Sequence, residues 1–159
     1  MNEVLDKLNE WVAVLKSGTK FQGKHLLQYI SDTNGKTYNC CLGVLGGLLP
    51  TCTFELNAKE AFYNNLTSLR GEAYFIEESS WIKEKYYLNT DSNVILKSDK
   101  FKEWAEKQNL DYTQIYSNEI EDLLVNFNDD CDLNFLQIAE FLELFFIPYV
   151  EEKENEKGN

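Results

Sequence analysis

The sequence predicts a single compact α+β domain over residues 1–150, in which a small antiparallel sheet packs with about five or six helices. Apolar residues recur at helical spacing near both ends of the chain, whereas the middle holds several short runs of β-prone residues. Hydrophobic residues make up 43% of the 159-residue chain, which contains ten Phe, nine Tyr and three Trp. A chain of this length fits one domain with an ample core. The acidic and polar residues 151–159 are expected to form a disordered tail.

The first predicted element is a helix from Glu3 to Lys16. Its apolar residues fall at helical spacing and are Val4, Leu5, Leu8, Trp11, Val12 and Leu15. Asn2 is a suitable amino-terminal cap, and Gly18 is typical of a residue that ends a helix.

Segment 19–39 has a weaker pattern. Phe21–Gly23 is typical of a turn or a short extended piece, and Leu26–Ile30 fits either a strand or a helix. Asn34 and Gly35 form a dipeptide that is favoured between paired strands, so they indicate a turn.

A short buried helix is predicted over Cys40–Leu49, and Pro50 ends it. Glycine destabilises a helix, so the three glycines of this segment are expected to permit tight packing; they are Gly43, Gly46 and Gly47. Free cysteine is usually buried as a small hydrophobic residue, and this interpretation is preferred for Cys40 and Cys41. The alternative is a reactive thiol paired with His25, the only histidine in the chain.

The middle of the chain is expected to supply the sheet. Its β-prone runs are Thr51–Leu56, Glu72–Ile76, Lys85–Leu88 and Val94–Leu96, with a helix over Ala58–Leu69.

Three helices are predicted after the sheet from their capping residues. The caps are Ser98 or Asp99, then Asn118, and then Asn134 with Gln137, a pair that resembles a capping box. The last helix has one wide apolar face, formed by Phe135, Ile138, Ala139, Leu142, Phe145 and Phe146. Pro148 is expected to end this helix.

Charge is distributed unevenly along the chain, whose net charge is −12. Residues 108–152 contain no Lys or Arg but hold eleven acids: Asp111, Glu119, Glu121, Asp122, Asp129, Asp130, Asp132, Glu140, Glu143, Glu151 and Glu152. This field repels nucleic-acid phosphates, so direct nucleic-acid binding is not expected, whereas a basic host protein would be attracted to acidic face 108–152.

No apolar run approaches the length that spans a bilayer, so no membrane association is expected. The four cysteines lack Cys-x-x-Cys spacing and indicate neither a disulfide framework nor a zinc site; we expect reduced thiols. Alternating oxygen-bearing side chains over residues 128–134 are similar to a calcium loop, but Leu133 and Ala139 replace its required Gly and Glu. Turn and cap roles are preferred there.

The polar stretch 17–25 is the main candidate for ligand binding. It contains two lysines, an imidazole, two hydroxyls and an amide, and its glycines can let backbone amides approach an anion. The candidate ligand-binding residues are Lys20, Gln22, Lys24 and His25, together with Tyr38 for stacking and Arg70 for a bidentate phosphate contact. The stretch lacks the spacing of a nucleoside-triphosphate loop, and the simpler interpretation is a surface connection.

Four motifs in order resemble those of a widespread group of small tailed-bacteriophage proteins. They are Trp11 in the first helix, Ser17-Gly18 followed by Phe21-Gln22-Gly23, Tyr38-Asn39-Cys40-Cys41-Leu42-Gly43-Val44-Leu45, and the closing helix from Phe135 to Glu140. The resemblance spans most of the chain and implies a phage accessory protein that acts in the host cytoplasm on host physiology or immunity. It implies no particular chemistry.

Three functional hypotheses follow from these observations. The preferred one is non-catalytic sequestration, by a homo-oligomer without a cofactor, of a cyclic nucleotide or cyclic ADP-ribose-type immune signal. The second is an acidic protein-binding inhibitor that imitates nucleic acid or blocks a basic surface of a host defence protein. The third is a signal-degrading enzyme, which is the weakest because no motif assembles a catalytic site.

Overall fold

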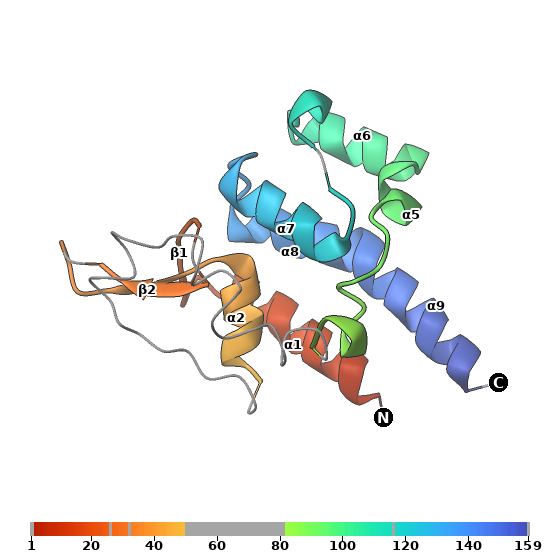
Figure 1. Ribbon diagram of the computed structural model, residues 1–159, viewed down its shortest axis with the longest axis horizontal. Helices are drawn as coiled ribbons and strands as arrows, with labels where there is room; N and C mark the ends of the chain where they lie inside the picture. Colours follow the sequence, from red (N-terminus) through yellow and green to blue (C-terminus); the bar gives the residue numbers. More distant parts are fainter. Residues whose placement is uncertain (1, 26, 32, 50–81, 116, 159) are drawn as a thin grey trace.

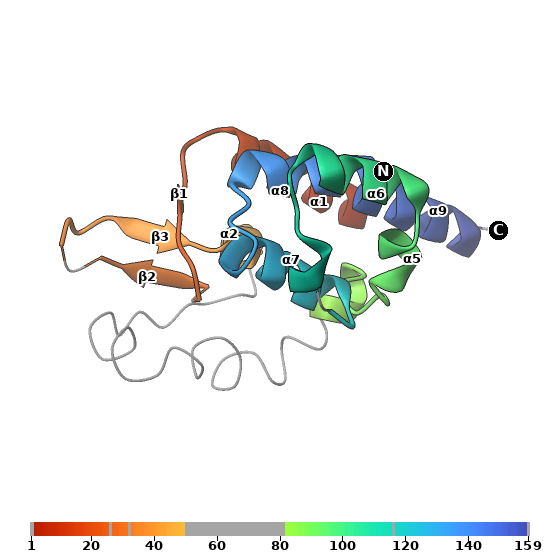
Figure 2. The same ribbon diagram turned by 90° about the horizontal axis from the view of Figure 1, so that it is seen from above.

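The computed structural model describes residues 2–25, 27–31, 33–49, 82–115 and 117–158, and it has an α+β fold (Figure 1). The helices form one end of the molecule, where both chain termini lie, and a small sheet projects from the other end (Figures 1 and 2). None of the helices in the described ranges is long and apolar enough to cross a membrane.

Seven α-helices and three strands have both ends within the described residues, against the five or six helices expected. In chain order the elements are α1 (Glu3–Lys16), β1 (Phe21–Gln22), β2 (Gln28–Ile30), β3 (Thr37–Asn39), α2 (Cys41–Gly47), α5 (Asn93–Leu96), α6 (Asp99–Lys107), the 3-10 turn η1 (Tyr112–Gln114), α7 (Ile120–Asp129), α8 (Phe135–Phe141), the π-helical turn η2 (Leu142–Phe146) and α9 (Ile147–Lys157). Residues 82–85 are also helical.

The first helix and α6 begin at their predicted caps. The Asn2 side-chain oxygen accepts a hydrogen bond from the backbone N–H of Leu5 at 3.1 Å. Gly18, just after α1, has a φ of +72°, which glycine adopts at little cost. Ser98 caps α6 through its hydroxyl oxygen.

The last two caps were predicted to within one residue. Asn134 and Gln137 exchange hydrogen bonds of 2.9 Å between side chain and backbone, as the predicted capping box requires. The N-cap of α7 is Glu119 and not Asn118. The backbone N–H of Glu119 donates a hydrogen bond to the Asp122 side chain. This bond completes a second capping box and makes Glu119 the N-cap.

The sheet has the strand order β1-β3-β2. β2 and β3 form an antiparallel hairpin whose turn contains Asn34 and Gly35, and Gly35 has a φ of +69°, so the predicted turn is confirmed. β1 pairs with β3 in parallel. The sheet is therefore mixed and not purely antiparallel, because β1 arrives from the end of α1 in the same direction as β3.

The described strands come from residues 21–39, and neither of the two predicted strands that the structure describes, Lys85–Leu88 and Val94–Leu96, is a strand. Val94–Leu96 lies in α5, where Ile95 is buried and its N–H donates to the Ser92 carbonyl at 3.0 Å. Lys85 is the last of the helical residues 82–85, and residues 86–88 after it form turns. Burial decides the conformation of such short apolar runs, so the prediction of strands there was wrong. The predicted elements Thr51–Leu56, Ala58–Leu69 and Glu72–Ile76 lie outside the described residues.

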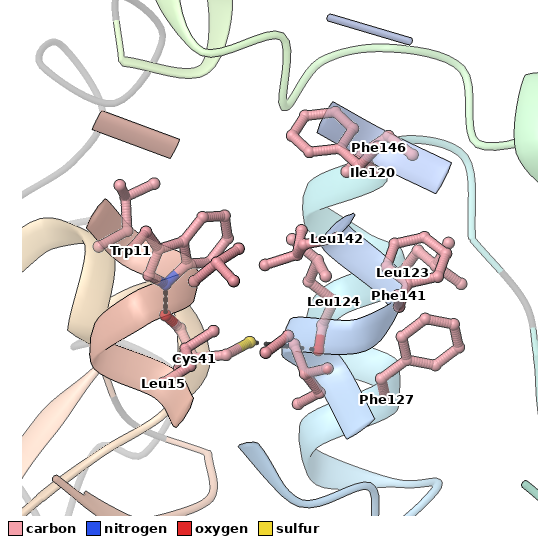
Figure 3. Packing of buried hydrophobic residues seen from close by; sticks show 14 of the residues in the cluster. Trp11, Leu15, Cys41, Ile120, Leu123, Leu124, Phe127, Phe141, Leu142 and Phe146 are labelled. Atoms are coloured by element: carbon pink, nitrogen blue, oxygen red, sulfur yellow. Dashed lines mark hydrogen bonds between the residues drawn. The ribbon is translucent and has the colours of Figure 1, made fainter. Parts of the chain in front are cut away.

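The main core lies between α1 and α2 on one side and α7, α8 and η2 on the other (Figure 3). Trp11 and Phe141 are fully buried and come from opposite sides of this core. α6 packs its own aromatic rings onto the core, with Phe101 6.4 Å from Phe127 and Trp104 5.8 Å from Phe141 between ring centroids. Dense aromatic packing therefore joins the C-terminal helices into one body.

The C-terminal helix continues past Pro148, contrary to prediction. The backbone N–H of Ile147 donates to the Leu142 carbonyl, five residues back, which widens the turn at η2. Pro148 thereby falls in the first turn of α9, where a missing N–H costs little. α9 then runs to Lys157, and its Val150 side chain is fully buried. The tail that was expected to be disordered is therefore helical as far as Lys157.

The end of α9 is held by hydrogen bonds to Glu154. Asn2 donates to this carboxylate at 2.9 Å, the Tyr87 hydroxyl also donates to it, and the Lys157 ammonium lies 3.1 Å away. These donors come from the amino terminus, from the chain after residue 85 and from α9 itself. Local composition alone did not reveal them.

We predict that Glu154→Gln lowers the free energy of unfolding at pH 7 and matters less at pH 3. Hydrogen bonds from Tyr87 and Asn2 hold the pKa of Glu154 below its usual value of 4.5. The carboxylate therefore stabilises the fold above that pH, and this stability is lost as the pH falls through the lowered pKa. Urea titrations at both pH values test this, with Glu151→Gln on the same helix as control. An equal loss at both pH values would contradict it.

The predicted tight packing is confirmed at Gly43 but not at Gly47. A Cβ atom at Gly43 would lie 1.7 Å from the backbone oxygen of Leu27, whereas one at Gly47 would meet nothing within 4 Å. Gly43 therefore allows α2 to approach the backbone that precedes β2.

We predict that Gly43→Ala lowers the free energy of unfolding by roughly 1–3 kcal/mol, as overpacking does. Gly47→Ala is the matched control, and it should be neutral or stabilise by up to about 1 kcal/mol because alanine favours helix. Urea unfolding of both variants measures the difference. Equal effects at the two positions would show that packing against Leu27 does not matter.

Candidate ligand-binding surface on the sheet

Three aromatic side chains form a row across one face of the sheet. Strand pairing places Phe21 of β1 and Tyr29 of β2 opposite Tyr38 of the central strand. Ring centroids of Phe21 and Tyr38 lie 5.6 Å apart, and those of Tyr29 and Tyr38 lie 5.3 Å apart with planes only 7° from parallel. We call these three residues the aromatic row. Phe21 is 46% exposed, and both tyrosines are partly exposed.

Gly23 provides the space for one ring of the row. A Cβ atom there would lie 2.6 Å from Cε1 of Tyr29 and 3.0 Å from Cβ of Tyr38. The Gly23 N–H donates to the Asn39 carbonyl at 2.8 Å and extends the pairing of β1 with β3. Burial, followed by the nearby Tyr38 phenol, raises the pKa of Tyr29, so its hydroxyl is neutral at physiological pH.

Cationic and amide groups surround the aromatic row. The Lys36 ammonium lies 4.7 Å from the centroid of the Phe21 ring, and the Asn34 amide donates to the Tyr38 hydroxyl at 2.9 Å. Lys20 is exposed and directly precedes Phe21. Neither Lys20 nor Lys36 forms an ion pair with a carboxylate of the described residues. The surface therefore combines exposed rings with positive charge.

The opposite face of the sheet is made of amides that point toward the helices. Successive side chains in a strand point to opposite faces, so Gln22, Gln28 and Asn39 lie behind the aromatic row. Gln28 donates to Asn39 at 3.0 Å. Gln22 donates to the Asn128 side-chain oxygen at 2.9 Å and to the Leu133 carbonyl at 2.8 Å.

Asn128 is fully buried in α7 and uses both ends of its amide. Its oxygen accepts from Gln22 and from the backbone N–H of Cys41 at 3.3 Å. Its nitrogen donates to the Gly23 carbonyl at 2.8 Å and to the Asp129 carboxylate at 2.9 Å. One side chain thus connects β1, α2 and α7.

Two predicted ligand-binding residues, Lys24 and His25, contact carboxylates at the end of α7 and in the loop after it. The Lys24 ammonium pairs with the Asp132 carboxylate. The His25 backbone N–H donates to Asp129 at 3.1 Å, and its ring Nδ1 lies 3.7 Å from the other oxygen of that carboxylate. Both residues therefore already have a carboxylate partner within the fold.

The six predicted site residues thus separate into two groups. Gln22, Lys24 and His25 come together, but they contact the α7 end and its loop. Tyr38 belongs to the aromatic row, Lys20 is exposed and directly precedes Phe21, and Arg70 lies outside the described residues. The prediction missed Phe21, Tyr29, Lys36 and Asn34. The available signal was an aromatic residue at each of positions 21, 29 and 38 on both sides of the Asn34-Gly35 turn.

The adjacent cysteines Cys40 and Cys41 are buried in the structure, as the preferred interpretation of the sequence predicted. Cys41 is fully buried, its thiol donates to the Leu124 carbonyl at 3.6 Å, and burial raises its pKa (Figure 3). The Cys40 sulfur accepts from the Gly43 N–H at 3.4 Å at the start of α2. His25 pairs with Asp129 and not with either sulfur. Both thiols are therefore packed as small hydrophobic groups.

The acidic third of the chain is largely engaged within the fold. Nine of its eleven acids make a hydrogen bond or ion pair, namely Asp111, Glu119, Glu121, Asp122, Asp129, Asp130, Asp132, Glu140 and Glu143. The other two, Glu151 and Glu152, are exposed on α9. The acids are thus shared among caps and ion pairs on several elements.

A groove of about 450 Å³ lies beside α7, away from the aromatic row. Its lining residues are Ser117, Asn118, Asp122, Val125, Asn126 and Asp130. Two exposed carboxylates make this groove unsuitable for an anionic ligand.

Comparisons of the chain with protein-family models, with curated proteins and with solved structures found no match.

We predict that Asn128→Ala lowers the free energy of unfolding by about 2–4 kcal/mol, because it leaves buried backbone groups of Gly23 and Cys41 without partners and removes one of the two hydrogen bonds of the Gln22 amide. Urea unfolding measures the loss, and near-ultraviolet circular dichroism of the tyrosines reports whether the aromatic row is displaced. Asn155→Ala, on the exposed surface of α9, is the control and should change stability by less than about 0.5 kcal/mol. A loss no larger than the control's would show that the Asn128 amide is dispensable.

Proposed function

We propose that this chain is a phage accessory protein that antagonises host antiviral defence by non-catalytic binding of a nucleotide-derived immune signal. The observation that carries the proposal is the aromatic row with the Lys36 ammonium over its Phe21 ring. A nucleotide offers a planar base and negative phosphates, and exposed rings beside a lysine complement both parts.

The separation of charge within the molecule supports an anionic ligand at this surface. The sheet that carries the aromatic row lies at the end of the molecule away from the chain termini (Figures 1 and 2). Lys20 and Lys36 remain available there. The net negative charge of the whole chain still opposes long nucleic acids, whose charge exceeds that of a small nucleotide.

Binding without conversion is favoured by the state of the groups that could catalyse a reaction. The Cys41 thiol has a raised pKa and is buried, and the His25 ring faces the Asp129 carboxylate. A nucleophilic thiol needs the opposite environment, with exposure and a lowered pKa.

The phage context comes from the motif resemblance. Trp11 donates to the Cys41 carbonyl at 2.8 Å, Gln22 binds Asn128, and Gly43 packs on the Leu27 backbone. Most motif residues therefore hold the fold together. Phe21 and Tyr38 are the quoted residues that also belong to the aromatic row.

The acidic inhibitor remains the second candidate, supported by the exposed Glu151 and Glu152 on α9. Charge reversal at Glu119, Glu121 and Asp122 is a poor test, because it would break a capping box and the ion pair to Lys83. Reversal of the two α9 acids leaves the core and caps intact, and loss of inhibition in that variant would favour the second candidate.

A release assay tests sequestration. The purified protein is mixed with cyclic dinucleotides and cyclic ADP-ribose isomers, the free fraction is removed, and the protein is then heat-denatured. We predict that one ligand is depleted and returns chemically intact in the mass spectrum, because no described group is placed to cleave it. Protein denatured before mixing is the control.

Two results would contradict the proposal. A converted product would make the protein an enzyme. Depletion of no ligand would favour the acidic protein-binding inhibitor.

A further inference from the structure

Phe21 is the most open ring of the aromatic row. The rings of Tyr29 and Tyr38 stack on each other, whereas Phe21 stands at the end of the row with 46% of its surface exposed. The only cation over it among the described residues is the Lys36 ammonium at 4.7 Å from the ring centroid. A flexible, exposed side chain therefore lies on the ring that a planar ligand would contact.

We propose that Phe21 stacks on the base of a small nucleotide and that Lys36 moves from the ring to the ligand's phosphate. This inference rests on the proposed sequestration and assigns residues to it. The exchange is favourable because an exposed contact between ammonium and ring is weak, whereas base stacking and an ammonium–phosphate contact are each stronger.

The geometry of the strands supports this division of roles. Lys36 directly precedes β3, and Phe21 is paired with Tyr38 of that strand, so the ammonium needs only a side-chain rotation to leave the ring. Lys20, which directly precedes β1, is exposed and has no ion pair with a carboxylate of the described residues. Lys24 cannot take this role without breaking its ion pair with Asp132.

The ligand class follows from these groups. The ligand needs a planar base for the ring and at least one phosphate for the ammonium. A nucleoside gains the stacking contact but must displace Lys36 without offering it a new partner. Nucleotides should therefore bind more tightly than nucleosides, and Lys36 should be the residue that makes the difference.

The test uses adenosine and AMP as probes, with binding to the full chain measured by NMR titration. Phe21→Leu keeps an apolar side chain but loses the stacking surface, and it should weaken both probes by about tenfold. Lys36→Gln should weaken AMP by about tenfold while leaving adenosine unchanged or tighter, because the competitor for the ring is gone. Phe21→Tyr should retain binding, and Lys97→Gln, on the distant α5 side, should change neither probe.

Several outcomes would overturn the inference. One is an equal loss of both probes in Lys36→Gln, which would mean that Lys36 only holds the hairpin. Another is unchanged binding in a Phe21→Leu variant whose melting temperature matches the parent. A third is tighter binding of a single-stranded hexanucleotide than of AMP, which would mean that the surface prefers a nucleic-acid strand to a small nucleotide as its ligand.

Failure of this inference is distinguishable from failure of the proposed function. If the parent protein releases an intact signal nucleotide and both variants do so equally, the residue assignment is wrong and sequestration stands. If the parent binds no nucleotide at all, both are wrong.

Discussion

The position of the sheet depends on one buried amide, that of Asn128. Its partners Gln22, Gly23 and Cys41 lie between 87 and 106 residues away in the chain, and each contributes a polar group that is shielded from water. A buried polar group without a partner destabilises a fold, so these groups stabilise the structure only when all of them meet. The hydrogen bonds of Asn128 therefore form together only when β1 and α2 pack on α7 in one particular arrangement.

This docking determines which face of the sheet remains outside. A half-buried sheet usually turns its apolar side inward. Here Gln22 faces the helices and donates to Asn128, and the alternation of side chains then places Phe21 and its neighbour Tyr38 on the other face. The exposure of the aromatic row thus follows from the polar contact behind it, which also connects the sheet to the core.

The sequence predicted the parts of this fold that local interactions decide. Caps such as Ser98 and the turn at Asn34-Gly35 need only neighbouring residues, and both are present. The hairpin register was not predictable, because a two-residue turn at that dipeptide would pair Ser31 with Tyr38, whereas a longer loop brings Tyr29 opposite it. Strands of two or three residues carry no usable period. The π-helical turn that admits a proline into the last helix likewise leaves no pattern in the residues.

The candidate site was only partly predicted because its contacts, unlike caps and turns, depend on residues that are far apart in the chain. Lys24 and His25 are candidate phosphate contacts by sequence, but Asp132 and Asp129 contact them from more than a hundred residues away. Lys20 and Lys36 have no ion pair with a carboxylate in the described part of the chain. The acids of the C-terminal third therefore help to decide which lysines of the sheet region are left without an ion pair, and of these Lys36 lies over the aromatic row.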